Sequence, residues 1–167
     1  MSIVYFDSSA FVKLVVEEDG SDLAAALWDG CDAAVSSRLA YPEVRAALAA
    51  AGRAHRLDPA DQVRAETAWD DYWSATRPVE LTQVVTARAG ALAGQHGLGG
   101  ADAVHLASLL AVGAADTLFA VWDQRLRVGA REAGVRLAPL EQPVRRDPAP
   151  GFSGRCIGRP VDRWRPA

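Results

Sequence analysis

Lysine is almost absent from this sequence, since Lys13 is the only one and arginine supplies the other positive charges. Cysteine is scarce too: Cys31 and Cys156 form no CxxC motif and are too few for a disulfide framework. No apolar run approaches the roughly 20 residues that span a bilayer. The N-terminus lacks the basic stretch of a signal peptide. We therefore expect a soluble protein of the reducing cytoplasm that does not contact a membrane.

The chain has 167 residues, half of them hydrophobic, which suits one domain with a full core. Residues 143–167 carry six arginines, two aspartates and five of the nine prolines, a net charge of +4. The whole chain stands at −3, so residues 1–142 stand at −7. We predict one folded domain over residues 1–140 and a poorly ordered, proline- and arginine-rich tail over 141–167. Such a tail is either a solvated end or a contact for RNA backbone or an acidic partner.

Short apolar runs alternate with helical patterns along the body. The predicted strands cover residues 3–6, 33–35, 79–81, 117–122 and 135–137. The predicted helices cover about 9–15, 21–28, 43–51, 59–75, 83–95, 102–112 and 124–133. We expect Ser8 or Ser9 to cap the first helix and Ser36 or Ser37 to cap the third. Strands separated by helices predict an α/β fold of three layers, α/β/α, with a central, mostly parallel sheet of four to five strands.

Four acidic residues are directed to one edge of this predicted sheet. Asp7 and Asp123 directly follow buried strands, and Asp102 opens a helix. Glu43 lies in the first turns of the helix after the second strand. Because functional sites of open parallel sheets lie outside the carboxyl ends of the strands, we expect these four side chains in one crevice. Asp116 precedes its strand, so it belongs to the opposite edge and is excluded.

Four carboxylates in one crevice repel each other unless a cation lies between them. Mg²⁺ and Mn²⁺ prefer oxygen ligands, and the sequence offers no cluster of cysteine or histidine for a softer metal. Metal-bound water is an effective nucleophile, and two ions can stabilise both the attacking and the leaving oxygen of a phosphodiester. The acids therefore indicate a Mg²⁺ or Mn²⁺ site for phosphodiester hydrolysis.

Each acid lies in a stretch that resembles PIN-domain ribonucleases, most closely the VapC-type toxins of type II toxin–antitoxin pairs. The four stretches are residues 5–14, 37–48, 101–107 and 119–126, in the order and at the intervals usual in that family. One such stretch is a weak signal, whereas four in register are a strong one. The resemblance extends over the body to about residue 140.

The resemblance implies a metal-dependent endoribonuclease whose catalytic and metal-binding residues are Asp7, Glu43, Asp102 and Asp123. It implies Mg²⁺, with Mn²⁺ as the other choice, and structured RNA such as tRNA as substrate. It also implies a homodimer and inhibition by a small cognate antitoxin protein whose tail enters the site. Ser9 falls where the family often has a hydroxyl or amide. Val121 is a departure, because the family usually has Ser or Thr two residues before the last aspartate.

Three functional hypotheses from different classes follow. The first is the ribonuclease, and the second is a catalytically weak PIN-fold protein that binds RNA or protein, which Val121 supports. The third is a phosphatase of the haloacid-dehalogenase type, which also has an aspartate after its first strand. That chemistry needs a second acid shortly afterwards and a downstream lysine. Ser9 occupies the first position and Lys13 is the only lysine, so the third hypothesis fails.

Other polar and aromatic residues have a simpler interpretation. Each aspartate that follows a strand can cap the next helix. We interpret Lys13 as a solvated helix residue and His105 as a packed or hydrogen-bonded one. Trp69, Tyr72 and Trp73 share a helix face and indicate core packing, with a dimer or antitoxin surface as the alternative. The arginines at 125 and 127 either flank RNA backbone or face solvent.

Overall fold

A five-stranded parallel sheet forms the centre of the molecule, with the strand order β3-β2-β1-β4-β5. The computed structural model describes residues 2–140, so the predicted tail lies outside the described residues. The strands are β1 (Ile3–Phe6), β2 (Ala33–Ser37), β3 (Arg77–Val79), β4 (Thr117–Ala120) and β5 (Arg136–Ala138). The prediction of a parallel α/β sheet of four to five strands is confirmed.

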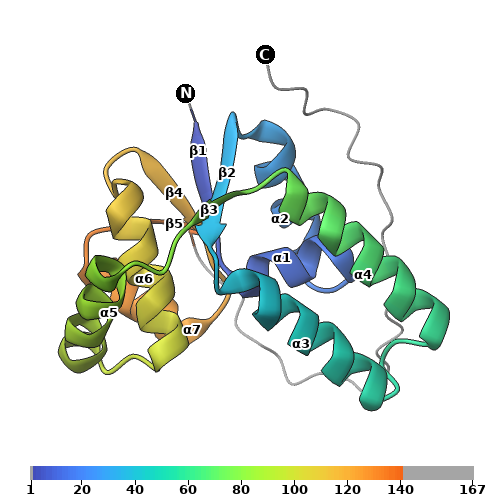
Figure 1. The fold of residues 1–167 in the computed structure, drawn as a ribbon. Helices are drawn as coiled ribbons and strands as arrows, with labels where there is room; N and C mark the ends of the chain where they lie inside the picture. Colours follow the sequence, from blue (N-terminus) through green and yellow to red (C-terminus); the bar gives the residue numbers. More distant parts are fainter. Residues whose placement is uncertain (1, 141–167) are drawn as a thin grey trace.

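Helices cover both faces of the sheet, as the alternating pattern predicts (Figure 1). One layer holds α1 (Ser8–Val15), α2 (Ser21–Gly30), α3 (Ala40–Arg53) and α4 (Pro59–Ser74). The other layer holds α5 (Gln83–His96), α6 (Gly100–Val112) and α7 (Gln124–Glu132). Asp58 caps α4 by accepting the amide of Asp61 at 2.7 Å, and Pro59 begins that helix. Within the described residues, no helix is both long enough and apolar enough to cross a membrane.

Two hydrophobic cores lie on the two faces, because side chains alternate along each strand. In β1, Val4 and Phe6 pack into the core under α1–α4, whereas Tyr5 packs into the core under α5–α7. In β4, Ala120 belongs to the first core and Phe119 to the second. Both strands are therefore buried on both sides, and their ends are held at fixed positions.

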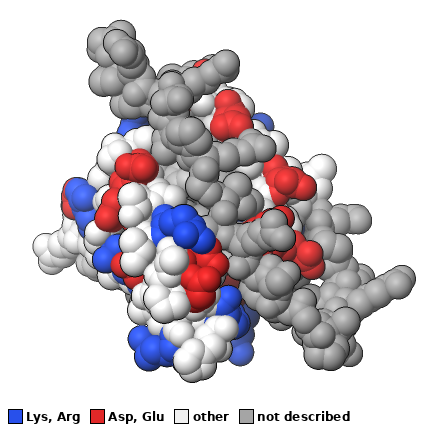
Figure 2. All heavy atoms as spheres, turned by 90° about the vertical axis from the view of Figure 1, so that its right-hand side faces the viewer, with Lys and Arg blue, Asp and Glu red and all other residues white. Residues whose placement is uncertain are grey.

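The aromatic trio of α4 packs mainly into the first core. Trp69 is fully buried and Tyr72 is buried, while Trp73 is partly buried against the same core. The ring of Trp69 lies 4.8 Å from that of Phe11. The prediction of core packing is thus confirmed for Trp69 and Tyr72. On the face that α3 and α4 cover, positive and negative side chains are interspersed (Figure 2).

Several predicted strand boundaries are wrong. β4 ends at Ala120, two residues before the predicted end, and β5 begins one residue later than predicted. The differences at β2 and β3 have a clear physical reason. Ser36 and Ser37 continue β2 and do not cap α3, whose N-cap Leu39 has no side-chain cap hydrogen bond. The Ser36 hydroxyl instead donates to the Phe6 carbonyl at 2.6 Å, which satisfies it inside the sheet. The third strand comes two residues earlier than predicted and contains Pro78. Proline is tolerated there because β3 is an edge strand.

Candidate active site

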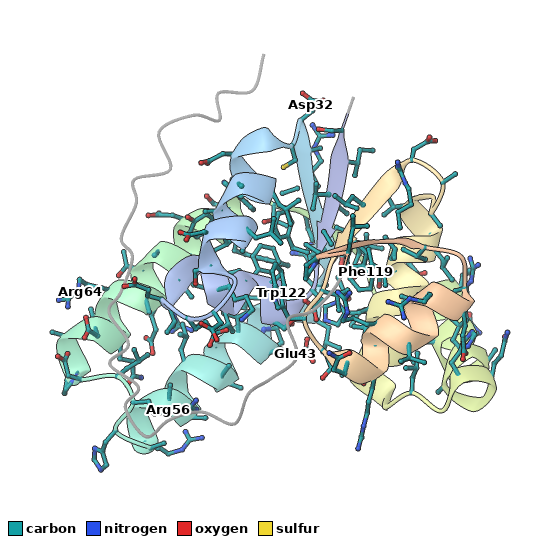
Figure 3. All side chains as sticks on the ribbon, turned by 180° about the vertical axis from the view of Figure 1, so that it is seen from behind. Asp32, Glu43, Arg56, Arg64, Phe119 and Trp122 are labelled. Carbon is teal, nitrogen blue, oxygen red and sulfur yellow. The ribbon has the colours of Figure 1, made fainter. Side chains whose placement is uncertain are left out.

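All four predicted acids lie at the carboxyl edge of the sheet. Asp7 directly follows β1 and Asp123 comes shortly after β4, while Glu43 and Asp102 lie in the first turns of α3 and α6. In Figure 3, Glu43 and Trp122, the neighbour of Asp123, both lie in the middle of the molecule, away from Asp32 at the top. The negative charges of Asp123 and Glu43 both act on Asp102, which places Asp102 within electrostatic reach of both.

Asp116, which precedes β4, is exposed and belongs to the opposite edge, as its position in the sequence predicts. It therefore offers a control position outside the candidate site.

Two of the acids also cap helices. Asp7 caps α1 by accepting the Ala10 amide at 3.0 Å, so the prediction that Ser8 or Ser9 does so is wrong. Asp123 caps α7. Asp102 is not a cap, because α6 begins at Gly100, two residues earlier than predicted. Capping and metal binding are compatible in one carboxylate when they use different oxygens.

Asp7 and Asp123 each accept their hydrogen bonds through the same oxygen, Oδ1. At Asp7, both the Ser9 hydroxyl, at 2.8 Å, and the Ala10 amide reach Oδ1. At Asp123, the amides of Arg125 and Leu126 reach Oδ1 at 2.9 and 3.0 Å. The second oxygen of each group, Oδ2, is therefore the one suited to a ligand.

The ends of β1 and β4 are tied together beside the site. The Asp7 amide donates to the Ala120 carbonyl at 3.2 Å. The Ser9 hydroxyl donates to Asp7 and accepts the Trp122 amide at 2.9 Å. Ser9, a secondary candidate from the sequence, thus couples the orientation of Asp7 to the chain that leads into Asp123.

Burial makes an unbalanced negative charge costly here. Desolvation raises the pKa of Asp7, which is only 4% exposed, from 3.8 to about 6. Burial, and then the charge of Asp123, raise the pKa of Asp102. A cation at the site would relieve both effects, because it favours the ionised carboxylates.

Glu43 has a different environment from the aspartates. Burial would raise its pKa, but the hydrogen bond and the charge of His105, together with the Ser8 hydrogen bond, lower it below its usual range. His105 Nε2 lies 2.8 Å from Glu43 Oε2, and the Ser8 hydroxyl donates to the same oxygen at 2.5 Å. Tyr5 completes the group, with its hydroxyl 3.2 Å from His105 Nδ1. This network confirms that His105 is hydrogen-bonded.

Nothing in the sequence pointed to the parts that Tyr5 and Ser8 play. The only sequence signal for His105 was its place one turn after Asp102, and nothing in the sequence connects it with Glu43.

Two basic residues that the sequence predicts to be exposed, Lys13 and Arg127, are buried. Lys13 is buried, and its ammonium binds Glu18 at 2.6 Å and the Asp19 carbonyl at 2.7 Å above the Trp122 ring. Arg127 is 3% exposed and donates to the carbonyls of Val121 and Pro139. The predictions of a solvated Lys13 and of an Arg127 that contacts RNA or faces solvent are wrong.

Val121 is fully buried in the core under α5–α7. The residue at this position therefore contributes apolar packing in place of a hydroxyl. The hydroxyl of Ser9 lies beside the neighbouring Trp122 amide.

Oxygen donors dominate the candidate site, which suits Mg²⁺ or Mn²⁺. Among residues 2–140, however, no three acidic, histidine or cysteine side chains already converge closely enough to hold an ion. The donor chemistry fits such a cation, and the one-sided hydrogen bonds leave an oxygen for it on Asp7 and Asp123.

The three-layer fold with acidic residues at its carboxyl edge agrees with the family to which the sequence belongs. Residues 4–129 match the family model of the PIN domain, so the chain is a member of that family. It is similar to the ribonucleases VapC45 and VapC49 of Mycobacterium tuberculosis, from strains CDC 1551 / Oshkosh and ATCC 25618 / H37Rv respectively. Each is 64% identical to it over 141 residues, which cover 84% of this chain and 98% of the relative.

Proposed function

We propose that this protein is a metal-dependent endoribonuclease and the toxin of a toxin–antitoxin pair, with Asp7, Glu43, Asp102 and Asp123 as its catalytic and metal-binding residues. The observation that carries the proposal is the position of these acids along one edge of the sheet, where burial raises the pKa of Asp7 and Asp102. The identity with two ribonucleases supports RNA as the substrate.

Mg²⁺ is the proposed cofactor, with Mn²⁺ as the other choice. A bound divalent ion supplies a Lewis acid that acidifies water and stabilises charge on phosphate oxygens. The Oδ2 atoms of Asp7 and Asp123 are the proposed ligand atoms, because Oδ1 is hydrogen-bonded in both. Asp102 and Glu43 would complete the set of ligands.

The proposed partners are RNA, a small antitoxin protein and a second copy of the chain, in the cytoplasm. They rest on the resemblance to VapC-type toxins. Light scattering of the purified protein alone tests the homodimer. The same measurement after antitoxin is added tests the toxin–antitoxin complex. A toxin that stays monomeric and binds no product of a neighbouring small gene would contradict them.

Cleavage of RNA by purified protein tests the proposed activity. We expect cutting with Mg²⁺ or Mn²⁺ and none with EDTA. Asp7→Asn should lower the rate by roughly 100-fold or more, because it removes a ligand but keeps the cap. Asp116→Asn, at the opposite edge, is the matched control and should cut like the wild type. Equal cutting by Asp7→Asn and wild type would rule out the proposed site.

A second candidate function is a catalytically weak PIN-fold protein that binds RNA or protein. The observation that favours it is the buried Val121, which leaves no hydroxyl two residues before Asp123. The variant Val121→Thr should cut faster if that hydroxyl limits the rate. A folded protein that binds RNA and cuts none of it with either metal would establish this alternative.

A further inference from the structure

His105 is an unusual residue for its place in the molecule. It is 2% exposed and lies on α6 between the buried apolar residues Ala103 and Leu106. Both ring nitrogens nevertheless have polar partners, Tyr5 at Nδ1 and Glu43 at Nε2. The ring therefore connects the sheet to a candidate metal-binding carboxylate.

The direction of the hydrogen bonds follows from their partners. The Tyr5 hydroxyl lies 3.2 Å from Nδ1 of His105, so this ring nitrogen is occupied by the sheet. Nε2–H then donates to the Glu43 carboxylate. The hydroxyl of Ser8 donates to the same carboxylate. The Ser8 hydroxyl also lies 3.3 Å from Nε2 of His105, so Ser8 and His105 meet at the same oxygen of Glu43.

Both donors to Glu43 use Oε2. We propose that His105 is a positioning residue of the acidic site, which together with Ser8 fixes Oε2 and leaves Oε1 of Glu43 as the oxygen that binds the cation. This inference rests on the proposed function. Asp7 and Asp123 follow the same pattern, since backbone amides and Ser9 fix one of their oxygens.

Core packing alone does not account for a histidine at this position. A leucine would fill the space without a polar group that has to be satisfied. The network instead joins four elements, with Tyr5 on β1, Ser8 on α1, Glu43 on α3 and His105 on α6. Groups that orient metal ligands in this way typically change metal affinity by roughly 10–100-fold when they are removed.

Mn²⁺ affinity of the purified full-length protein, measured by isothermal titration calorimetry, tests the role of His105. We expect His105→Leu to weaken Mn²⁺ binding about tenfold or more. His105→Gln, which keeps a donor near the position of Nε2, should stay within roughly threefold of the wild type. Circular dichroism and thermal unfolding of each variant check that it is folded.

The Glu43→Gln background separates positioning from general packing. If His105 acts through Glu43, adding His105→Leu to Glu43→Gln should leave the remaining Mn²⁺ affinity unchanged within about twofold. Equal weakening in both backgrounds would overturn the proposal. So would a folded His105→Leu protein that binds Mn²⁺ like the wild type, because His105 would then serve packing only.

Ser8→Ala provides a test that leaves the core intact if His105→Leu does not fold. It removes one of the two bonds to Oε2 and should weaken Mn²⁺ binding about threefold or more. Unchanged affinity in Ser8→Ala and in Tyr5→Phe would overturn the proposal. Absence of Mn²⁺ binding by the wild type would instead refute the proposed function itself, so the two failures are distinguishable.

Discussion

In the proposed site, single carboxylates serve two purposes on different oxygens. Asp7 and Asp123 each cap a helix through Oδ1, which holds the side chain in one orientation. Capping was the simple interpretation of these aspartates and metal binding the functional one. The geometry shows the caps, and the proposed metal binding is compatible with them, because a cap that fixes one oxygen also fixes the direction of the other.

The raised pKa of Asp7 predicts a stability effect with a definite sign. The folded protein holds the proton up to about pH 6, whereas the unfolded chain releases it near 3.8. Without metal, stability is therefore lost as the pH rises between these values, by up to on the order of 3 kcal/mol. Asp7→Asn removes this loss. We expect the variant to be more stable than the wild type at pH 7.5 in EDTA.

Urea unfolding at pH 4, 5.5 and 7.5 measures this difference. The advantage of Asp7→Asn should be largest at pH 7.5 and become small at pH 4, close to the pKa of 3.8 below which Asp7 is protonated in both states. Asp116→Asn should show no such trend. Added Mn²⁺ should stabilise the wild type and not the variant. A variant that is less stable than the wild type at pH 7.5 would show that burial does not dominate the energetics of Asp7.

At the level of elements, the sequence predicted most of the fold because local signals agreed with each other. The apolar run before Asp7 and the cap–proline pair at Asp58 and Pro59 both marked real boundaries. Those signals are local in sequence. The alternation of short apolar strands with helices, which requires a parallel sheet, is also visible from local patterns. Topology alone then brought the four acids to one edge.

The errors occurred where a distant partner decides the outcome. Ser36 has the composition of a helix cap, but the carbonyl of Phe6, thirty positions away in the chain, takes its hydrogen bond. His105 and Glu43 are 62 positions apart, and no spacing rule links them. Lys13 looked solvated because lysine usually is, whereas Glu18 and the Trp122 ring enclose it.

The loop before α2 predicts a second effect at this scale. Gly20 has φ +94° and lies against Trp122, so an added Cβ would stand 2.6 Å from Nε1 of that ring. Gly20→Ala therefore combines left-handed strain with a clash, and we expect a loss of about 2 kcal/mol or more. Because Trp122 also binds Ser9, RNA cutting should fall as well.

Gly30→Ala is the matched control, since a Cβ at this position in α2 meets nothing within 4 Å. It should leave stability unchanged or raise it slightly, because alanine favours helix. Chemical denaturation compares the two variants. Equal stability of both would mean that the loop moves away from Trp122 at little cost.

For the whole molecule, the net charge opposes the binding of RNA. Residues 1–142 carry a net charge of −7, so an RNA backbone is repelled by the body as a whole. The proposed cation and local arginines must overcome this repulsion at the site. Residues 143–167, with six arginines and two aspartates, have a net charge of +4 that could attract RNA.

A chain shortened to residues 1–140 tests both the proposed domain boundary and the contribution of the C-terminal arginines to RNA binding. The cut keeps β5 and the bonds of Val121 to Ala138 and of Arg127 to Pro139. We therefore expect cooperative unfolding within about 0.5 kcal/mol of the full chain. The net charge changes from −3 to −6, because six arginines and three acids are removed.

RNA binding by the Asp7→Asn form of both chains, measured over a range of salt concentrations, shows what the tail contributes. If its arginines contact phosphates, the shortened chain should bind more weakly and with a smaller dependence on salt, because fewer counterions are released. Equal affinity and equal salt dependence would assign the tail no part in RNA binding. A shortened chain that unfolds without cooperativity would place the end of the domain beyond residue 140.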